Sequence, residues 1–384
     1  MNKYQKYCTG CGLCKALGKN ELSKDGKGFY YPNSKNNFLK TICPISGAHS
    51  KYLDKNNIWG KNLNVYLGWS NNSKIRNRAS SGGIITEVAC FLLNTNKVDA
   101  VIQVGVDSSE PTKTNVYFSK SAEEIVSYCG SRYCISSPLS VLGNLEKNKK
   151  YAFIGKPCDI VALRNYMKMY PKYKDKIPYL LSFFCMGLPS EIAQKKLLEK
   201  LNCKNCKILS YRGNGWPGFT TAIDITGNSY QITYNDSWGK ILGRDLMPSC
   251  KLCVDGIGEM ADVSCGDAWY LNNENRPDFS EHEGRNVVFA RTEKGNKLLN
   301  EMKEAGIVTL NYYKEYQKEL PLIQTSQWNR RREMKYRIIA MKLCLRDFPS
   351  YDSKLLSSYA SSLSIKQRIK IIFGTCKRII NGKM

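Results

Sequence analysis

Three cysteines near the start of the chain, Cys8, Cys11 and Cys14, are separated by two residues each and have glycines between them. Three thiolates at this spacing can hold three corners of one iron–sulfur cube, because glycine lets the backbone wrap closely around the sulfides. In two-cluster ferredoxins a further cysteine follows after three residues, but that position here is Gly18. The motif therefore predicts a single 4Fe–4S cluster whose last ligand is remote in the sequence.

Cys43, which precedes a proline, is the predicted fourth ligand. The segment 25–32 contains the turn residues of a hairpin, which would return the chain toward the motif. The alternative is a zinc site of four cysteines, although zinc sites usually use two separated cysteine pairs. Because His49 and His282 are the only histidines, few ligands are available for a mixed Cys/His zinc site.

The compartment decides how the 16 cysteines are interpreted. The first eight residues lack the apolar core of a signal peptide, and no run approaches the ~18 apolar residues of a membrane-spanning helix. We therefore expect a cytoplasmic protein. Clustered thiols in a reducing cytosol are metal ligands or redox groups more often than disulfides.

Four further cysteines lie where a function explains them better than packing does. Cys158 and Cys185 each follow an apolar strand-like run, and ligands collect at the carboxyl ends of strands in open α/β sheets. Cys250 and Cys253 form a CxxC pair, so these four thiols supply the ligands that a second cube needs. Each could instead be a buried, inert thiol. Three other cysteines could replace a ligand, and the sequence does not decide among them: Cys203, Cys206 and Cys265.

Alternating strand-like and helix-like segments begin at about residue 60 and predict an α/β (α+β) body. The expected strands are 98–106, 151–154, 179–185 and 287–291. We divide the chain into a small ferredoxin-like 4Fe–4S domain at 1–58, an α/β domain for the flavin and the second cluster at 59–325, and a basic, helical C-terminal segment at 326–384.

The formal net charge is +25, and from Arg330 onward 14 Lys/Arg face three acids. Apolar residues recur at helical spacing within 365–380, with basic residues between them. Such a helix can lie on the inner face of an anionic membrane, and the alternatives are a packing helix or a helix that docks a partner. A hypothesis of another class, a zinc-containing nucleic-acid-binding protein, rests on the charge, the 24 tyrosines and the arginines at 330–332.

Taken together and in this order, these motifs resemble the coenzyme F420 hydrogenase/dehydrogenase beta-subunit family, which includes chlorophyll-cycle reductases. The matching stretches are CTGCGLC (8–14), SSGGIITEVACFLL (80–93), GSRY (130–133), GKPCDIVALRNY (155–166), FFCMGLPS (183–190), YRGNGWPG (211–218), CKLCVDGIGEMADVSCGDAW (250–269) and VVFARTEKG (287–295). The resemblance implies one or two 4Fe–4S clusters, with the same four second-cluster ligands by position, and a bound FAD. Many relatives carry a second complete ferredoxin motif, which this chain lacks.

No G-x-G-x-x-G follows a strand, so a Rossmann site has no direct support. The stretch Ser80, Ser81, Gly82 and Gly83 begins an apolar helix-like run, and a helix start attracts an anion such as a pyrophosphate. The alternative is a plain serine N-cap. Two glycine-flanked polar loops complete the predicted flavin contacts: Ser131, Arg132, Tyr133, Arg212 and Asn214. Asp262 and Asp267 are weighed only as polar anchors, and no catalytic residue is predicted.

The expected function is an oxidoreductase that passes electrons between the clusters and FAD and exchanges a hydride equivalent with a deazaflavin or another organic substrate. The expected partner is an electron carrier such as a ferredoxin, and the oligomeric state is left open. Relatives in cell-surface polysaccharide biosynthesis suggest a sugar- or lipid-linked substrate as the alternative. A non-catalytic electron-transfer subunit is a third reading.

Overall fold

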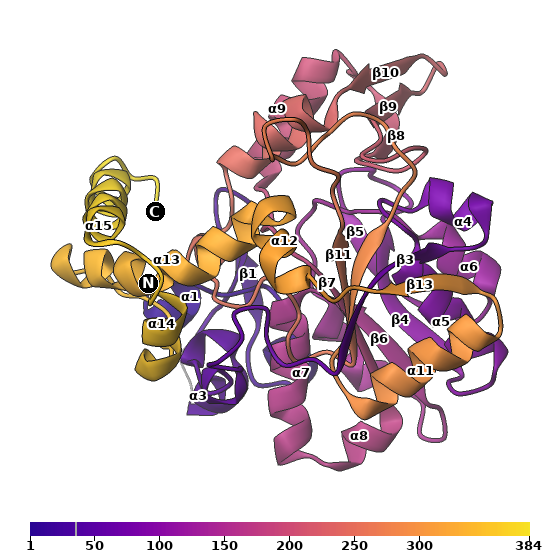
Figure 1. The fold of residues 1–384 in the computed structure, drawn as a ribbon, viewed down its shortest axis with the longest axis horizontal. Helices are drawn as coiled ribbons and strands as arrows, with labels where there is room; N and C mark the ends of the chain where they lie inside the picture. Colours follow the sequence, from indigo (N-terminus) through magenta and orange to yellow (C-terminus); the bar gives the residue numbers. More distant parts are fainter. Residues whose placement is uncertain (35–36) are drawn as a thin grey trace.

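The computed structural model describes residues 1–34 and 37–384 and is built around a mixed eight-stranded sheet (Figure 1). In spatial order its strands are β13 (Val308–Tyr312), β3 (Asn64–Ser70), β12 (Asn286–Ala290), β11 (Val263–Asp267), β7 (Tyr179–Phe183), β6 (Tyr151–Gly155), β4 (Ala100–Val106) and β5 (Thr114–Ser119). The four central strands β11, β7, β6 and β4 are parallel, and the others pair antiparallel. The predicted α/β body is confirmed.

Strand residues alternate between two buried faces of this sheet. Val288 and Ala290 of β12 join one core, whereas Val287 and Phe289 join the core on the other side. A strand buried on both faces is apolar throughout, which is why these segments were recognisable in the sequence. Helices cover both faces, with α5 (Ile84–Asn94), α6 (Ala122–Ser127) and α11 (Glu293–Glu304) on one and α7 (Pro157–Met169) and α12 (Tyr316–Ile323) on the other.

The N-terminal segment packs directly on the sheet face that α7 covers. Leu13, Leu39 and Ile42 share one core with Phe153 of β6 and Ile160 of α7. The predicted hairpin is present as an antiparallel pair of short strands. The elements of this segment are α1 (Lys3–Lys6), α2 (Leu13–Ala16), β1 (Leu22–Lys24), β2 (Tyr30–Pro32) and α3 (Asn37–Ile42). The division of the chain at residues 58 and 325 stays a prediction.

A second, antiparallel sheet lies beyond one edge of the main sheet and was not expected from the sequence (Figure 1). Its strands are β10 (Ser229–Ile232), β9 (Thr220–Asp224) and β8 (Cys206–Ser210), and α9 (Glu191–Leu201) packs with them in a separate core. The strands mix polar with apolar residues and are only partly buried, so they lack the continuous apolar runs of the main sheet. The remaining short helices are α4 (Ser73–Arg78), α8 (Lys172–Lys176) and α10 (Pro248–Lys251).

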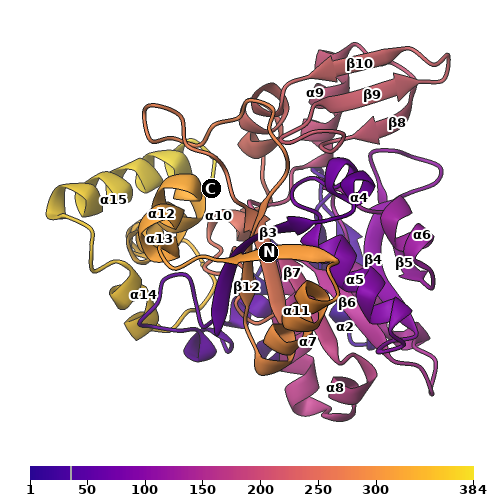
Figure 2. The same ribbon diagram turned by 45° about the vertical axis from the view of Figure 1, so that its right-hand side comes forward.

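The expected C-terminal helices are α13 (Thr325–Leu343), α14 (Ser353–Tyr359) and α15 (Ile365–Ile380), and α15 lies outermost, along α13 (Figure 2). Arg331 is fully buried, where it binds Glu259 at 2.8 Å, and Arg330 is 9 % exposed. Two of the three consecutive arginines are therefore unavailable to a nucleic acid. Across residues 1–34 and 37–384, no helix is both long and apolar enough to span a membrane.

Candidate functional site

The four cysteines of the N-terminal segment line one small cavity. The loop before α2 brings Cys8 and Cys11 to it, Cys14 lies in α2 itself, and Cys43 directly follows α3. Its other walls are largely apolar and include Tyr4, Leu22, Leu39, Ile42 and Ala162. We call Cys8, Cys11, Cys14 and Cys43 the first cysteine group.

Burial dominates the electrostatics of the first cysteine group. It raises the pKa of Cys8 to about 12, although the backbone N–H of Gly10 donates to the Cys8 sulfur at 3.3 Å. Burial likewise raises the pKa of Cys11 and Cys43, with neighbouring sulfurs adding to the effect and backbone N–H groups opposing it. Thiolates here need a bound cation to replace their protons, and backbone N–H donors to sulfur are typical of iron–sulfur ligation.

Four more thiols gather beyond the carboxyl ends of β6 and β7. Cys158 lies in the first turn of α7, and Cys185 lies two residues after β7, which ends at Phe183 and not at Cys185 as expected. Cys158 interacts electrostatically with Cys185 and Cys253, and Cys185 interacts with Cys250. We call Cys158, Cys185, Cys250 and Cys253 the second cysteine group.

Two buried cations accompany the second cysteine group. Burial raises the pKa of Cys185 to about 11, while Arg330 and Lys156 act in the opposite direction. Arg330 Nη1 donates to the carbonyl of Cys185 at 3.0 Å, and Nη2 donates to that of Met186 at 2.6 Å. Tyr351, from the C-terminal segment, lies close enough to interact with Cys158, Cys250 and Cys253.

The two cysteine groups are neighbours. Asp159 in the first turn of α7 interacts electrostatically with Cys11, and Ala162, one turn later, lines the first group's cavity. Ser249, next to Cys250, donates its hydroxyl to the Cys8 carbonyl at 3.2 Å. Within the described residues, no three Cys, His, Asp or Glu side chains converge on a point that would hold one metal ion.

The structure places the remaining cysteines apart from these groups. Cys203 and Cys206 hydrogen bond to each other in the core beneath the second sheet. Cys265 is buried in β11, and Arg291 is the neighbour that acts on it. The other cysteines are Cys90 in α5, Cys129 and Cys134 beside the glycine-flanked loop, and Cys344 and Cys376, which contact one another.

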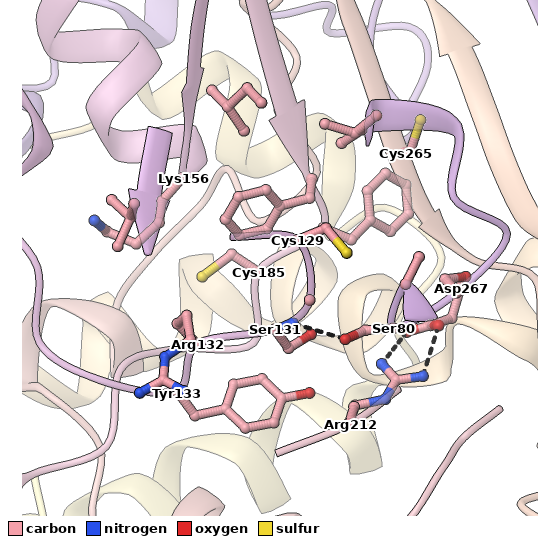
Figure 3. A pocket seen from close by; sticks show the side chains of 18 of the residues that line it. Ser80, Cys129, Ser131, Arg132, Tyr133, Lys156, Cys185, Arg212, Cys265 and Asp267 are labelled. Carbon is pink, nitrogen blue, oxygen red and sulfur yellow. Dashed lines mark hydrogen bonds and ion pairs between the residues drawn. The ribbon is translucent and has the colours of Figure 1, made fainter. Parts of the chain in front are cut away.

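A larger cavity of about 270 Å³ opens at the carboxyl edge of the parallel strands (Figure 3). The ends of β6, β7 and β11 contribute Gly155, Phe183 and Asp267, because parallel strands all finish at this edge. Phe183 keeps 38 % of its surface exposed within the cavity wall. Cys185 is also part of that wall, so the cavity adjoins the second cysteine group.

Most residues predicted to contact a flavin lie in this wall. The Ser131 backbone N–H donates to Ser80 Oγ at 2.6 Å, which joins two of the predicted loops (Figure 3). Ser81 Oγ donates to the carbonyl of Arg285 and accepts from the side chain of Asn286. These contacts hold both loops against the start of β12.

The N-terminus of α5 opens into the cavity. Its N-cap is Gly83, in the left-handed conformation with φ 79°, which has no side chain to cap the helix, and Asn286 Oδ1 accepts from the Ile84 backbone N–H at 3.3 Å. The alternative of a plain serine N-cap is therefore wrong. The first-turn residues Ile84, Ile85 and Thr86 line the cavity, so the positive end of the helix dipole points to it. Gly82 lies outside the lining, and a Cβ there would come within 2.7 Å of the Gly68 carbonyl oxygen.

The other predicted contacts differ in what they offer a ligand. Arg212 lines the cavity, but its guanidinium is engaged with both oxygens of Asp267 at 3.0 Å each. Arg132 also lines it and donates to the carbonyls of Leu209 and Pro111. Tyr133 presents its ring within the same wall (Figure 3). Asn214 is exposed and lies outside the lining.

A buried ion pair in the cavity wall, beside Cys158, was not expected from the sequence. Lys156 Nζ donates to Asp159 Oδ2 at 2.7 Å and to Ser136 Oγ at 3.0 Å. Burial alone lowers the pKa of Lys156, but Asp159 and Cys158 raise it, and the net shift is upward. Asp159 Oδ1 has no hydrogen-bond partner among the described residues, although Asp159 is fully buried and lines the cavity. The signal was the spacing of Lys156 and Asp159 around Cys158, which we had interpreted for its cysteine alone.

Comparison with solved structures supports the fold. The chain superposes on one from the F420-reducing [NiFe] hydrogenase complex of Methanosarcina barkeri with a TM-score of 0.58 and 21 % identity, over 74 % of this chain and 94 % of that one. At this identity the likeness shows the fold alone.

Sequence comparison identifies the family. Coenzyme F420 hydrogenase subunit beta of Methanococcus voltae is 24 % identical over 261 residues, which are 65 % of this chain and 85 % of the relative. The chloroplastic 7-hydroxymethyl chlorophyll a reductase of Oryza sativa is 23 % identical over 303 residues, 77 % of this chain and 60 % of the relative. Both names are those of oxidoreductases. The family models for the N-terminal and C-terminal parts of the coenzyme F420 hydrogenase/dehydrogenase beta subunit match residues 65–143 and 148–315. The chain belongs to this family.

Proposed function

We propose that this chain is an iron–sulfur flavoprotein oxidoreductase that holds two 4Fe–4S clusters and FAD. The observation that carries the proposal is the grouping of eight cysteines in two neighbouring sets of four, the second of which adjoins a cavity. The clusters, when bound, supply one-electron transfer, and the flavin supplies the step between single electrons and a hydride.

The chemistry of the first cysteine group fits a cube. Its four sulfurs surround a common cavity, and a cube separates its thiolates by its own width, whereas zinc draws four sulfurs to about 2.3 Å from one ion. Sulfur-only ligands with backbone N–H donors suit iron–sulfur binding. The second cysteine group has the same ligand set plus two cations, Lys156 and Arg330, which offset the negative charge of a bound cluster.

The 270 Å³ cavity is close to the lower end of the range for cofactor sites, roughly 300–1,000 Å³. The first turn of α5, where Ile85 and Thr86 line the cavity, suits a phosphate group, and the partly exposed ring of Phe183 suits an aromatic ring system. Asp159 Oδ1, which has no hydrogen-bond partner in residues 1–34 and 37–384, leaves an acceptor for a ligand N–H. Ser80, Ser81, Gly83 and Ser131 would hold the flavin, and Cys185 would lie between flavin and cluster.

The roles of the protein groups follow from these positions. The cavity wall mixes apolar side chains with charged and polar ones. Its buried Lys156–Asp159 pair holds a proton-bearing Nζ that can supply a proton to a reduced organic substrate. The names of the relatives favour a deazaflavin substrate. A sugar- or lipid-linked substrate stays a prediction without an observation in its favour. A ferredoxin-like electron donor and a cytoplasmic location also belong to this proposal.

Anaerobic purification followed by quantification of metals and flavin in one sample tests the proposal. We expect a brown protein with about eight iron atoms and one FAD per chain. A colourless protein that contains zinc would overturn it. Intact clusters without flavin would favour the electron-transfer subunit.

A matched pair of variants tests the flavin site. Phe183→Ala removes the ring exposed in the cavity, and Phe219→Ala removes one that is 43 % exposed outside its lining. We expect only the first to weaken FAD binding, about tenfold, because aromatic stacking adds to the burial of area. Equal FAD affinity in both variants, measured by fluorescence titration, would contradict the assignment of the cavity.

A further inference from the structure

The outermost helix, α15, divides its apolar residues between two faces. It starts with a capping box at Ser364 and packs against α13, with Thr375 and Ile379 buried (Figure 2). The sequence alone could not distinguish a helix that packs from one that presents an apolar surface. The structure shows that α15 does both.

Four large apolar side chains of α15 remain exposed. Their exposed fractions are 73 % for Ile365, 49 % for Ile369, 72 % for Phe373 and 80 % for Ile380. Spacings of four, four and seven residues place them on one side of a helix with 3.6 residues per turn. We call them the outward stripe. Single exposed apolar residues are ordinary, but an aligned set marks an interaction surface.

The outward stripe lies in a strongly basic setting. The helix contains five basic residues and no acidic one: Lys366, Arg368, Lys370, Lys377 and Arg378. Lys366, Lys370 and Lys377 are exposed and, by helical geometry, follow one edge of the stripe. An apolar stripe bordered by lysines matches a surface with buried hydrocarbon and exposed negative charge.

We propose that the outward stripe docks this protein on an anionic membrane surface. Ile365, Ile369, Phe373 and Ile380 enter the boundary between headgroups and acyl chains, while the lysines contact lipid phosphates. A nucleic acid offers no apolar surface to these side chains. A second copy of α15 would bring its five positive charges close to the five of the first copy, and the two sets would repel each other. An anionic bilayer satisfies both features.

The position of α13 gives this docking a consequence for the redox site. One part of α13 packs on α15, and Arg330 of the same helix binds the carbonyl of Cys185. The second cysteine group is therefore linked to the membrane-facing helix through a single intervening helix. Docking itself does not depend on the proposed clusters or flavin.

Flotation with lipid vesicles tests the proposal on the full chain. We expect binding to vesicles of phosphatidylcholine mixed with phosphatidylglycerol, and little binding to phosphatidylcholine alone. Phe373→Asp should weaken binding at least about tenfold, because it removes one buried ring and adds a negative charge. Ile225→Asp is the matched control, since Ile225 is 65 % exposed outside α15, and it should bind like the wild type. The double variant Lys370→Gln/Lys377→Gln should bind more weakly and with less dependence on salt.

Several outcomes would overturn the proposal. They are absence of wild-type binding to the anionic vesicles, equal binding by Phe373→Asp, and equal binding to neutral vesicles. Light scattering tests for one further contradicting outcome. If the wild type is a dimer and Phe373→Asp is a monomer, the outward stripe is an interface between two copies of the chain. Since the substituted side chains are exposed, thermal unfolding should be unchanged and will show that the variants are folded.

Discussion

The two cysteine groups present the same four-thiol chemistry but are assembled differently. The first group comes from residues 8 to 43, mostly from one tight loop. The second group collects Cys158, Cys185 and the CxxC pair from segments almost a hundred residues apart, at the edge of a parallel sheet. One site is largely a product of local sequence, and the other exists only once the sheet has formed.

The surroundings of the groups differ in charge. Asp159 adds negative charge to both groups, and Asp255 adds it to the second. Around the second, Arg330 and Lys156 are buried cations. A cation stabilises the more negative, reduced form of a cluster, so the second group should have the higher reduction potential. Electrons would then come to rest beside the cavity, where the proposed flavin lies.

The largest expected effect is the loss of one cluster. Cys253→Ser should lower the iron content from about eight to about four atoms per chain, since a cube needs all of its thiolates. Cys206→Ser, in the other CxxC pair, should keep the full content because Cys206 pairs with Cys203 in a different core. Iron and sulfide analysis after anaerobic reconstitution measures both. If Cys206→Ser loses iron and Cys253→Ser does not, the second group has been assigned wrongly.

Next in size is the effect of the buried ion pair beside Cys158 of the second group. Lys156→Met should lower the free energy of unfolding by about 3–5 kcal/mol, because the fully buried Asp159 carboxylate loses its partner. Adding Asp159→Leu should recover most of this loss without restoring turnover. Denaturant unfolding and steady-state assays separate the two effects. If Lys156→Met alone has the same free energy of unfolding as the wild type, the ion pair does not stabilise the fold.

A glycine substitution tests the local construction of the first group. Gly12 has φ 84°, and a Cβ there would lie 2.9 Å from the Ser140 backbone nitrogen. Gly12→Ala should cost about 1–3 kcal/mol and reduce only the first cluster's occupancy. Gly18→Ala is the control, because Gly18 has φ 61° but no described atom within 4 Å of the new Cβ. It should cost about 1 kcal/mol and leave the iron content unchanged.

The smallest effect concerns the difference in potential. Arg330→Gln should lower the reduction potential of one cluster by roughly 50–100 mV, as expected for loss of one buried charge nearby. Arg330→Lys, which keeps the charge, should shift the potential less. Potentiometric titration followed by electron paramagnetic resonance distinguishes the two clusters. If the reduction potentials of both clusters shift equally, or only that of the first cluster shifts, Arg330 does not act specifically on the second cysteine group.

Sequence patterns predicted four of the eight strands of the main sheet, namely β4, β6, β7 and β12, which are apolar because they are buried on both faces, and they did not predict β3, β5, β11 and β13. The strands at 98–106, 151–154 and 287–291 were expected within about two residues of their observed bounds. The second sheet was missed, since β8 to β10 mix polar with apolar residues and are only partly buried. Cys185 was placed at the end of a strand, but β7 ends at Phe183 and the thiol lies in the loop that follows.

The sequence by itself determined the first cysteine group, because closely spaced thiols and glycines restrict a short loop to wrap around a common centre. It also determined the strand and helix periods, which report burial residue by residue. Only the tertiary structure decided that Arg330 and Arg331 are buried, that Lys156 and Asp159 form a buried ion pair in the cavity wall, and that α15 keeps four apolar side chains exposed. These contacts join segments that are far apart in the chain. A local sequence pattern cannot show which distant side chain will lie next to a given residue.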